Sequence, residues 1–351
     1  MKSLADYKEN IHSCSKCGLC QSVCPIYKIT GNDCTVSRGQ FIMLKHFLNG
    51  ELKMSKVINK YLDICLKCSA CSRFCPSGID VVDIISLAKA EYFKTHKLEH
   101  LKSFFLKFML NTINNIGCLL PKKQSKKFEK KVIYFAGCSD KGINAGSSVV
   151  KILNSLGVEV IIPNFNCCGY PFFINGDMAT FEEYMNKFYS ILQEYENYEV
   201  ITNCATCEKV LNSYAKWGEH KSIIIKNVFD YIKDNNLASK FELKKAKTVT
   251  FHKPCNMENY ETVKQILENT TNLNYIEMKD FDKCCGFNSL TNSKNRKLFE
   301  KLYKEKYNYI ENSGAKIVLT SCTACKITLK LFSRCKYKVY DLLEFLSKNI
   351  V

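Results

Sequence analysis

One arrangement of five cysteines occurs twice in the second half of the chain. A lone cysteine is followed by a Cys-Cys-Gly triplet and then by a Cys-x-x-Cys pair. The copies are Cys138, Cys167, Cys168, Cys204 and Cys207, and then Cys255, Cys284, Cys285, Cys322 and Cys325. Corresponding cysteines lie 117 or 118 residues apart, and a constant offset indicates an internal duplication. Because thiolates are soft metal ligands, the pattern predicts two metal centres rather than packing residues.

Each copy holds more thiols than a simple metal site needs. Zinc takes four ligands, and four cysteines hold a cubane [4Fe-4S] cluster. The fifth cysteine therefore either bridges two irons in an opened cluster or stays free for redox chemistry. The backbone must also turn at each Cys-Cys pair, and Gly169 and Gly286 would allow that turn.

Two further cysteine runs near the N-terminus share the spacing Cys-x2-Cys-x2-Cys-x3-Cys-Pro. The first is Cys14, Cys17, Cys20 and Cys24, and the second is Cys65, Cys68, Cys71 and Cys75. Three closely spaced thiolates can hold one face of a [4Fe-4S] cluster, and the proline then directs the chain away. Zinc explains this grouping poorly, because it takes ligands in two pairs. The runs predict two [4Fe-4S] clusters.

The four motifs account for 18 of the 21 cysteines and leave out Cys34, Cys118 and Cys335. We interpret Cys34 as a spare thiol. The first ten residues contain no apolar signal-peptide core, which favours a reducing cytoplasm and metal chemistry over disulfides. The formal net charge of +17 belongs to the metal-free chain. It suits an acidic partner protein or peripheral binding to an anionic membrane surface, whereas no nucleic-acid recognition motif is present.

The pattern of apolar residues predicts four regions. Residues 1–98 form a helical domain with two clusters, and residues 99–131 form a helix followed by a lysine-rich linker. Residues 132–240 and 241–351 are the two cysteine-rich domains, each an α/β unit with a parallel sheet. The predicted fold is therefore mixed, with an all-α N-terminal domain and two duplicated α/β units.

Strands and helices alternate in the same order in both repeats. We expect strands at 132–137, 158–162, 199–202 and 223–225 in the first, and at 248–252, 275–278, 316–320 and near Val339 in the second. The expected helices are 147–156, 180–195 and one through Asp230 in the first repeat, and 262–269, 293–311 and 342–346 in the second. The cysteines follow the strands, and sites form at the carboxyl ends of parallel strands.

The whole arrangement resembles the cysteine-rich CCG-domain family of iron–sulfur oxidoreductases. That family includes the iron–sulfur subunit of glycolate oxidase, the C subunit of anaerobic glycerol-3-phosphate dehydrogenase, and heterodisulfide reductase subunits. The N-terminal runs resemble two-cluster ferredoxins, in which the fourth cysteine of each run binds the other cluster. The resemblance implies one cluster on Cys14, Cys17, Cys20 and Cys75, and another on Cys65, Cys68, Cys71 and Cys24.

For the CCG motifs, the resemblance implies that each set of five cysteines holds a further, non-cubane [4Fe-4S] cluster. The phrase His252-Lys253-Pro254-Cys255 resembles the His-Asp-Pro-Cys common in that family, with Lys253 replacing the aspartate. His252 is then either a hydrogen-bond donor to cluster sulfur or a structural hydrogen-bonding residue. The ten CCG cysteines and His252 are the candidate catalytic residues, and the sequence does not choose among them.

Three functional hypotheses remain. In the first, the chain is an electron-transfer subunit, inactive alone, between an FAD-containing dehydrogenase and a quinone or other acceptor. The partner would oxidise a 2-hydroxy acid or glycerol 3-phosphate, since this chain has no Gly-x-Gly-x-x-Gly after a strand. In the second, it is a heterodisulfide reductase-like catalytic subunit that reduces a disulfide at a non-cubane cluster. In the third, it is a redox sensor or scaffold with zinc in one CCG motif.

Overall fold

The computed structural model describes residues 1–115, 128, 130–138, 145–238, 241–287, 296–333 and 336–350. Contacts group the chain into two compact units. Unit 1 comprises Met1–Leu106, Gly169–Glu182 and Lys283–Glu305, and unit 2 comprises Lys107–Cys168, Glu183–Asp282 and Lys306–Val351. Cys118, Cys335, most of the predicted linker and the predicted boundary at residue 240 lie outside the described residues.

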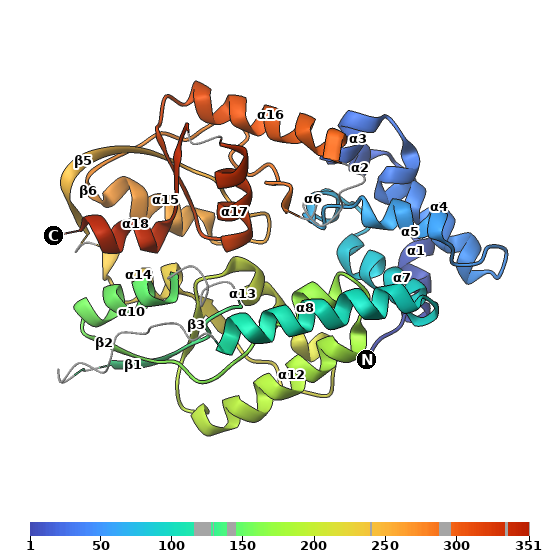
Figure 1. Cartoon of the computed structure of the whole chain (residues 1–351), viewed down its shortest axis with the longest axis horizontal. Helices are drawn as coiled ribbons and strands as arrows, with labels where there is room; N and C mark the ends of the chain where they lie inside the picture. The colour runs from blue at the N-terminus through green and yellow to red at the C-terminus, as the bar shows by residue number, and fades with distance from the viewer. Residues whose placement is uncertain are drawn as a thin grey trace. The chain divides into compact units, whose positions relative to one another are not determined.

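The N-terminal part of unit 1 is built from short helices, as predicted (Figure 1). Its α-helices are α1 (Lys8–His12), α2 (Leu19–Val23), α3 (Pro25–Thr30), α4 (Ser37–Leu48), α5 (Lys56–Asp63), α6 (Ala70–Arg73) and α7 (Val81–Thr95), with 3-10 turns at Ala5–Tyr7 and Asp33–Thr35. Helix α7 is apolar on most of its faces and forms the centre of the packing, with Ile84, Ile85 and Ala88 fully buried. Leu44 of α4 and Leu62 of α5 are buried as well.

Unit 2 contains two four-stranded parallel sheets with the same strand order. The first sheet has the order β2-β1-β3-β4 and the second β6-β5-β7-β8. The strands are β1 (Lys130–Tyr134), β2 (Val158–Ile161), β3 (Val200–Thr202), β4 (Ile225–Asn227), β5 (Glu242–Phe251), β6 (Thr271–Tyr275), β7 (Ile317–Thr320) and β8 (Lys338–Asp341). The identical order confirms the predicted fold class.

Each parallel connection is made through a helix, because parallel neighbours need a crossover. In the first repeat these are α10 (Ala145–Ser155), α12 (Met178–Leu192) and α13 (Ala205–Asn212), and α14 (Val228–Asp234) then leads from β4 to β5 of the second sheet. In the second they are α15 (Tyr260–Asn269), α16 (Arg296–Asn312) and α17 (Thr323–Phe332), and α18 (Leu342–Asn349) follows the last strand. Tyr170–Phe173 form the single-turn helix α11, and 3-10 turns occupy Gln193–Tyr195 and Tyr214–Lys216.

Two strands lie elsewhere than predicted, and helices α11, α13 and α17 were not predicted. A strand was expected at 223–225, whereas β4 begins at Ile225. We expected a strand at 275–278, whereas β6 ends at Tyr275. It is an edge strand that pairs only with β5, so polar residues such as Asn272 and Asn274 can face outward at little cost in free energy. These polar residues interrupt the apolar pattern from which a strand is predicted. Helices α13 and α17 carry the Cys-x-x-Cys pairs, which the sequence analysis treated only as metal ligands that follow a strand.

The two repeats share one apolar core within unit 2. It contains Leu153 of α10, Phe229 of α14, Val263 of α15 and Phe345 of α18, together with residues of β1 and β5. Apolar side chains of four helices thus join the two sheets, and the duplication buries surface that a single copy would leave in water.

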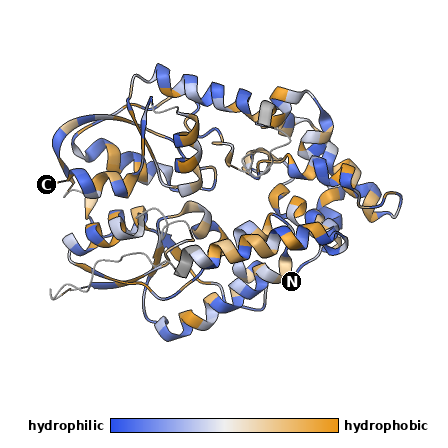
Figure 2. Cartoon of the chain, in the orientation of Figure 1, coloured by the Kyte–Doolittle hydropathy of each residue, from blue (hydrophilic) through white to orange (hydrophobic). Residues whose placement is uncertain are grey.

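Helix α8 (Lys97–Asn115) carries an exposed apolar stripe, visible as orange segments along it in Figure 2. Its members are Leu98, Leu101, Phe104, Phe105, Phe108 and Met109, each at least half exposed. Leu110, on another side of the helix, is 7% exposed. In the described part of the chain, we find no helix with both the length and the apolar character needed to cross a membrane.

Candidate metal centres

The two ferredoxin-type runs have the same backbone conformation. The second and fourth residues after the first cysteine have positive φ in both: Lys16 and Gly18 at 58° and 84°, and Lys67 and Ser69 at 54° and 56°. Left-handed residues in these positions curl each loop around its thiols, and short helices α2 and α6 follow. This repeated conformation is costly for residues other than glycine, so it indicates a functional constraint.

The fourth cysteine of the first run starts a helix, in which the following proline takes the first position. Cys24 is the N-cap of α3, its Sγ accepts a hydrogen bond from the Tyr27 backbone N–H at 3.5 Å, and Pro25 is the first helical residue. Proline lacks the N–H that would be unsatisfied there. The turn moves Cys24 away from its own run.

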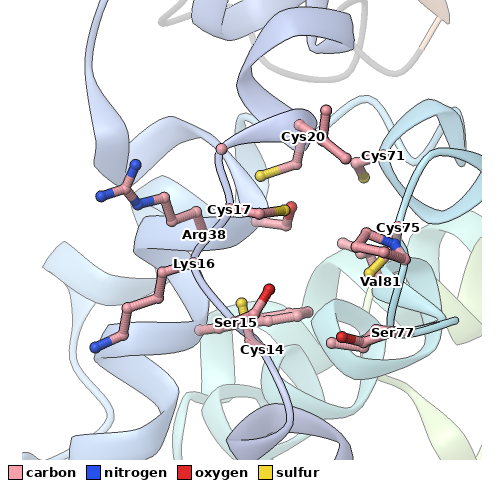
Figure 3. Close-up of a pocket in the computed structure, with 16 residues that line it drawn as sticks. Cys14, Ser15, Lys16, Cys17, Cys20, Arg38, Cys71, Cys75, Ser77 and Val81 are labelled. Carbon is pink, nitrogen blue, oxygen red and sulfur yellow. The ribbon is translucent and has the colours of Figure 1, made fainter.

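The first ferredoxin-type group is Cys14, Cys17, Cys20 and Cys75. These residues line one pocket in unit 1, together with Arg38 and Cys71. Figure 3 shows the sulfur atoms of the group turned toward the space between them. The fourth member comes from the other run, which is the pattern of crossed ligands that the ferredoxin resemblance implies.

The second ferredoxin-type group is Cys24, Cys65, Cys68 and Cys71. Burial, together with smaller contributions from Cys65 and Cys68, raises the pKa of the Cys24 thiol to about 12, although the backbone N–H of Tyr27 opposes the rise. Burial likewise raises the pKa of Cys71, with contributions from the other three. Cys24 and Cys71 therefore resist ionisation on their own, whereas bound metal cations would stabilise their thiolates. The donor set therefore fits a thiolate-ligated cluster.

Two lysines lie in the interior beside the second ferredoxin-type group. Lys67 is 5% exposed and its Nζ donates to the Leu62 carbonyl at 2.9 Å. Lys89 is 7% exposed and its Nζ contacts Asp63 at 2.5 Å and Asn175 at 3.3 Å. Burial lowers the pKa of Lys67 to about 8, with a further contribution from Lys89.

The first CCG motif lies wholly in unit 2, where its five cysteines come together. Cys138 follows β1, Cys167 and Cys168 follow β2, and Cys204 and Cys207 follow β3. The Sγ atoms of Cys207 and Cys168 are 3.5 Å apart. Hydrogen bonds with Cys138 and Cys168, and then burial, raise the pKa of Cys167 well above its ordinary value. The motif thus gathers its thiols at the carboxyl ends of the strands, as predicted.

The second CCG motif is divided between the units. Cys255, Cys322 and Cys325 belong to unit 2, while Cys284 and Cys285 belong to unit 1. Gly286 has φ 80° and Gly169 has φ 69°, so both glycines make the predicted turn after the Cys-Cys pair. A tyrosine hydroxyl donates to the backbone of each triplet: Tyr214 to the Cys168 carbonyl at 2.9 Å, and Tyr303 to the Gly286 carbonyl at 3.1 Å.

His252 sits buried at the end of β5. Its Nδ1 is 3.1 Å from the Phe281 carbonyl, and one of its ring nitrogens lies within 4.8 Å of Cys325 Sγ. The first contact is the structural hydrogen bond that we considered, and the second keeps the imidazole next to a CCG thiol. The corresponding position in the first repeat, 117 residues earlier, is Phe135.

Two contacts between motifs were not predicted from the sequence. In unit 1, the Cys284 thiol hydrogen-bonds to Cys68 and lowers the pKa of Cys68. In unit 2, Cys204 contacts Cys322; Cys207 lowers the pKa of Cys204, but the contact with Cys322 and burial raise it more. Cys204 and Cys322 are equivalent in the two repeats, so this contact joins the repeats at the same position. That equivalence was the only indication in the sequence.

Models of known protein families match most of the chain. The model described as "4Fe-4S dicluster domain" matches residues 10–79, and the model described as "Cysteine-rich domain" matches residues 132–212 and 249–330. The dicluster match confirms the prediction of two [4Fe-4S] clusters in the N-terminal part. The two cysteine-rich matches coincide with the two repeats.

Similar curated proteins cover nearly the whole chain at low identity. An uncharacterized iron-sulfur protein of Methanococcus maripaludis is 26% identical over 93% of this chain and 68% of its own length. A probable glycolate oxidase iron-sulfur subunit of Bacillus subtilis is 22% identical over 91% of this chain and 88% of that protein. The D subunit of a dihydromethanophenazine:CoB–CoM heterodisulfide reductase from Methanosarcina acetivorans is 21% identical over 91% of this chain and 88% of that protein. These similarities confirm the predicted relationship to iron–sulfur oxidoreductase subunits.

Proposed function

Because the chain belongs to the iron–sulfur oxidoreductase family that joins a 4Fe-4S dicluster domain to two cysteine-rich CCG domains, we propose that it is an electron-transfer subunit. It would carry electrons from an FAD-containing dehydrogenase, acting on a 2-hydroxy acid or glycerol 3-phosphate, to a quinone or another acceptor. The similarity to glycolate oxidase iron-sulfur subunits supports this partner class.

The sulfur contacts between motifs are the observation that carries the proposal. In unit 1, Cys71 lines the pocket of the first ferredoxin-type group while belonging to the second, and Cys68 of the second contacts Cys284 of a CCG motif. In unit 2, Cys204 contacts Cys322. Ligands of neighbouring centres that touch one another keep the centres close, which is what electron transfer between them requires.

We propose the following ligand sets. The first and second ferredoxin-type groups hold one cubane each, and the five cysteines of each CCG motif hold a further cluster. Iron–sulfur clusters supply one-electron chemistry when bound. The chain's own contribution is to bury Cys167, Cys168, Cys207 and Cys325, each at most 3% exposed, which keeps water and thiol-modifying reagents away from them.

A second candidate function is reduction of a disulfide at the CCG motifs. Each motif has a fifth thiol beyond the four that a cubane needs, and the relatives include a subunit of a heterodisulfide reductase. Cys138 and Cys255 are partly exposed, unlike the other CCG cysteines. A disulfide substrate would therefore reach either motif from the side of its lone cysteine.

The test uses the full chain purified anaerobically with its clusters. It is mixed with an FAD-dependent glycolate or lactate dehydrogenase and the matching hydroxy acid, and reduction is followed by visible absorbance and EPR. We expect reduction only when dehydrogenase and hydroxy acid are both present. A C34S variant, which alters a cysteine outside all four motifs, should behave like the wild type.

Reduction by dithionite but by none of the dehydrogenases would contradict the proposal. In that case, a paramagnetic signal formed on oxidation with a mixed disulfide would favour the second candidate. Stoichiometric zinc in one CCG motif would contradict both in their full form and favour a sensor or scaffold.

A further inference from the structure

The two ferredoxin-type runs have matching loops but different surroundings. In the first run, Ser15 and Lys16 are exposed. Their counterparts in the second run, Leu66 and Lys67, are 6% and 5% exposed. A lysine thus occupies the same left-handed position in both loops, but in the first it reaches water and in the second it is buried.

The interior around the second run carries an excess of positive charge. The Lys67 ammonium donates to the Leu62 carbonyl at 2.9 Å, and Lys89 pairs with Asp63 at 2.5 Å. Burial raises the pKa of the Cys65 thiol, while the Lys67 ammonium, the Lys67 backbone N–H and Lys89 counter part of that rise. Arg73 also acts on the Cys68 thiol, but it lies on the surface, where water screens its charge.

A buried thiolate-ligated cluster should be hard to reduce, because the added electron increases a negative charge that water cannot solvate. A buried cation next to it opposes that effect, and local charge is one of the factors that set cluster potentials. We propose that Lys67 tunes the second ferredoxin-type cluster. Its positive charge raises the reduction potential of the cluster held by Cys24, Cys65, Cys68 and Cys71. The inference rests on the ligand sets proposed above and not on the identity of the partner.

The simpler alternative is that Lys67 only closes the end of helix α5. Leu62 lies in the last turn of α5, where carbonyl groups lack helical partners, and a lysine there stabilises the helix end. A purely structural role would affect stability and leave the potential unchanged. Asp63 separates the two hypotheses further, since removing its negative charge should move the potential in the opposite direction.

The experiment is a redox titration of the anaerobic full chain followed by EPR, with iron content measured in parallel. We expect K67M to lower the reduction potential of one ferredoxin-type EPR component by at least about 59 mV, which is a tenfold change in the equilibrium constant of a one-electron reduction. The conservative variant K67R should stay near the wild type, and D63N should raise the same potential. The matched variant K16M, in the exposed equivalent position, should give a much smaller shift and in the other component.

Several outcomes would overturn the proposal. One is a shift in K67M no larger than that in K16M, and another is an equal shift of K67M and K67R. Loss of iron from K67M with full retention in K67R and D63N, and no opposite shift in D63N, would assign Lys67 to holding the loop. If neither ferredoxin-type EPR component appears in the wild type, the proposed ligand sets are wrong, and the role of Lys67 that rests on them falls as well. If both components appear but K67M shifts neither potential, only the role of Lys67 is wrong.

Discussion

The two ferredoxin-type loops place side chains in backbone conformations that favour glycine. At equivalent positions, the first loop has Gly18 with φ 84° and the second has Ser69 with φ 56°. The left-handed region costs an L-residue roughly 1–2 kcal/mol. The second loop therefore bears a strain that the first avoids, and the internal repeat offers each position as the control for the other.

We expect G18A to reduce the free energy of unfolding by about 1 kcal/mol and S69G to increase it by a smaller amount. A Cβ at position 18 would approach the flexible Gln21 side chain at 3.0 Å, so backbone strain rather than a clash should dominate. Urea unfolding under anaerobic conditions measures both. The changes in the free energy of unfolding must have opposite signs in the two variants. Destabilisation by both variants would contradict the explanation that backbone strain at this position differs between the loops.

Helices α17 and α18 illustrate how elements of the second repeat are fixed together. Lys326 of α17 pairs with Glu344 of α18, and both side chains are nearly buried, at 10% and 12% exposure. Burial raises the pKa of Glu344, but the ammonium groups of Lys326 and Lys348 lower it more, so the net shift is downward. The pair holds α17, which carries Cys325, at a fixed position against α18.

We expect E344Q to reduce the free energy of unfolding at pH 7 by about 3 kcal/mol, because it leaves a buried lysine without its carboxylate. Since the folded pKa of Glu344 is depressed, its contribution is complete above its ordinary pKa and is lost as pH falls through the folded value. The difference from wild type should therefore shrink in acid. K348M, at a lysine that is 58% exposed, should cost less than about 1 kcal/mol. Equal effects of both variants would contradict the importance of burial.

At the scale of the whole molecule, the features that could be predicted are those that follow from the spacing of cysteines and the period of apolar residues. Cysteine spacing predicted two [4Fe-4S] clusters, and the resemblance to two-cluster ferredoxins implied how the two runs share their ligands. The constant offset predicted two sheets of the same topology. The edge strand β6 was misplaced because Asn272 and Asn274 interrupt its apolar pattern, and its register depends on pairing with β5. The contacts Cys68–Cys284 and Cys204–Cys322 could not be predicted, since they join residues 216 and 118 positions apart through tertiary packing.

The buried lysines could not be predicted either. Lys16 and Lys67 look equivalent in the sequence, and only the packing of the helical domain buries Lys67 and exposes Lys16. Spacing thus indicates which residues can hold a centre, while packing decides what surrounds that centre.

The most direct test of the central claim is the iron content of the anaerobic full chain and of its cysteine-to-serine variants. We predict at least about eight iron atoms per chain, from two [4Fe-4S] clusters, with further iron in the CCG motifs. C75S and C24S should each weaken a different ferredoxin-type EPR component, because each residue belongs to the group of the other run, and C34S should change neither. Fewer than eight iron atoms in the wild type, or loss of the same component in C75S and C24S, would contradict the account.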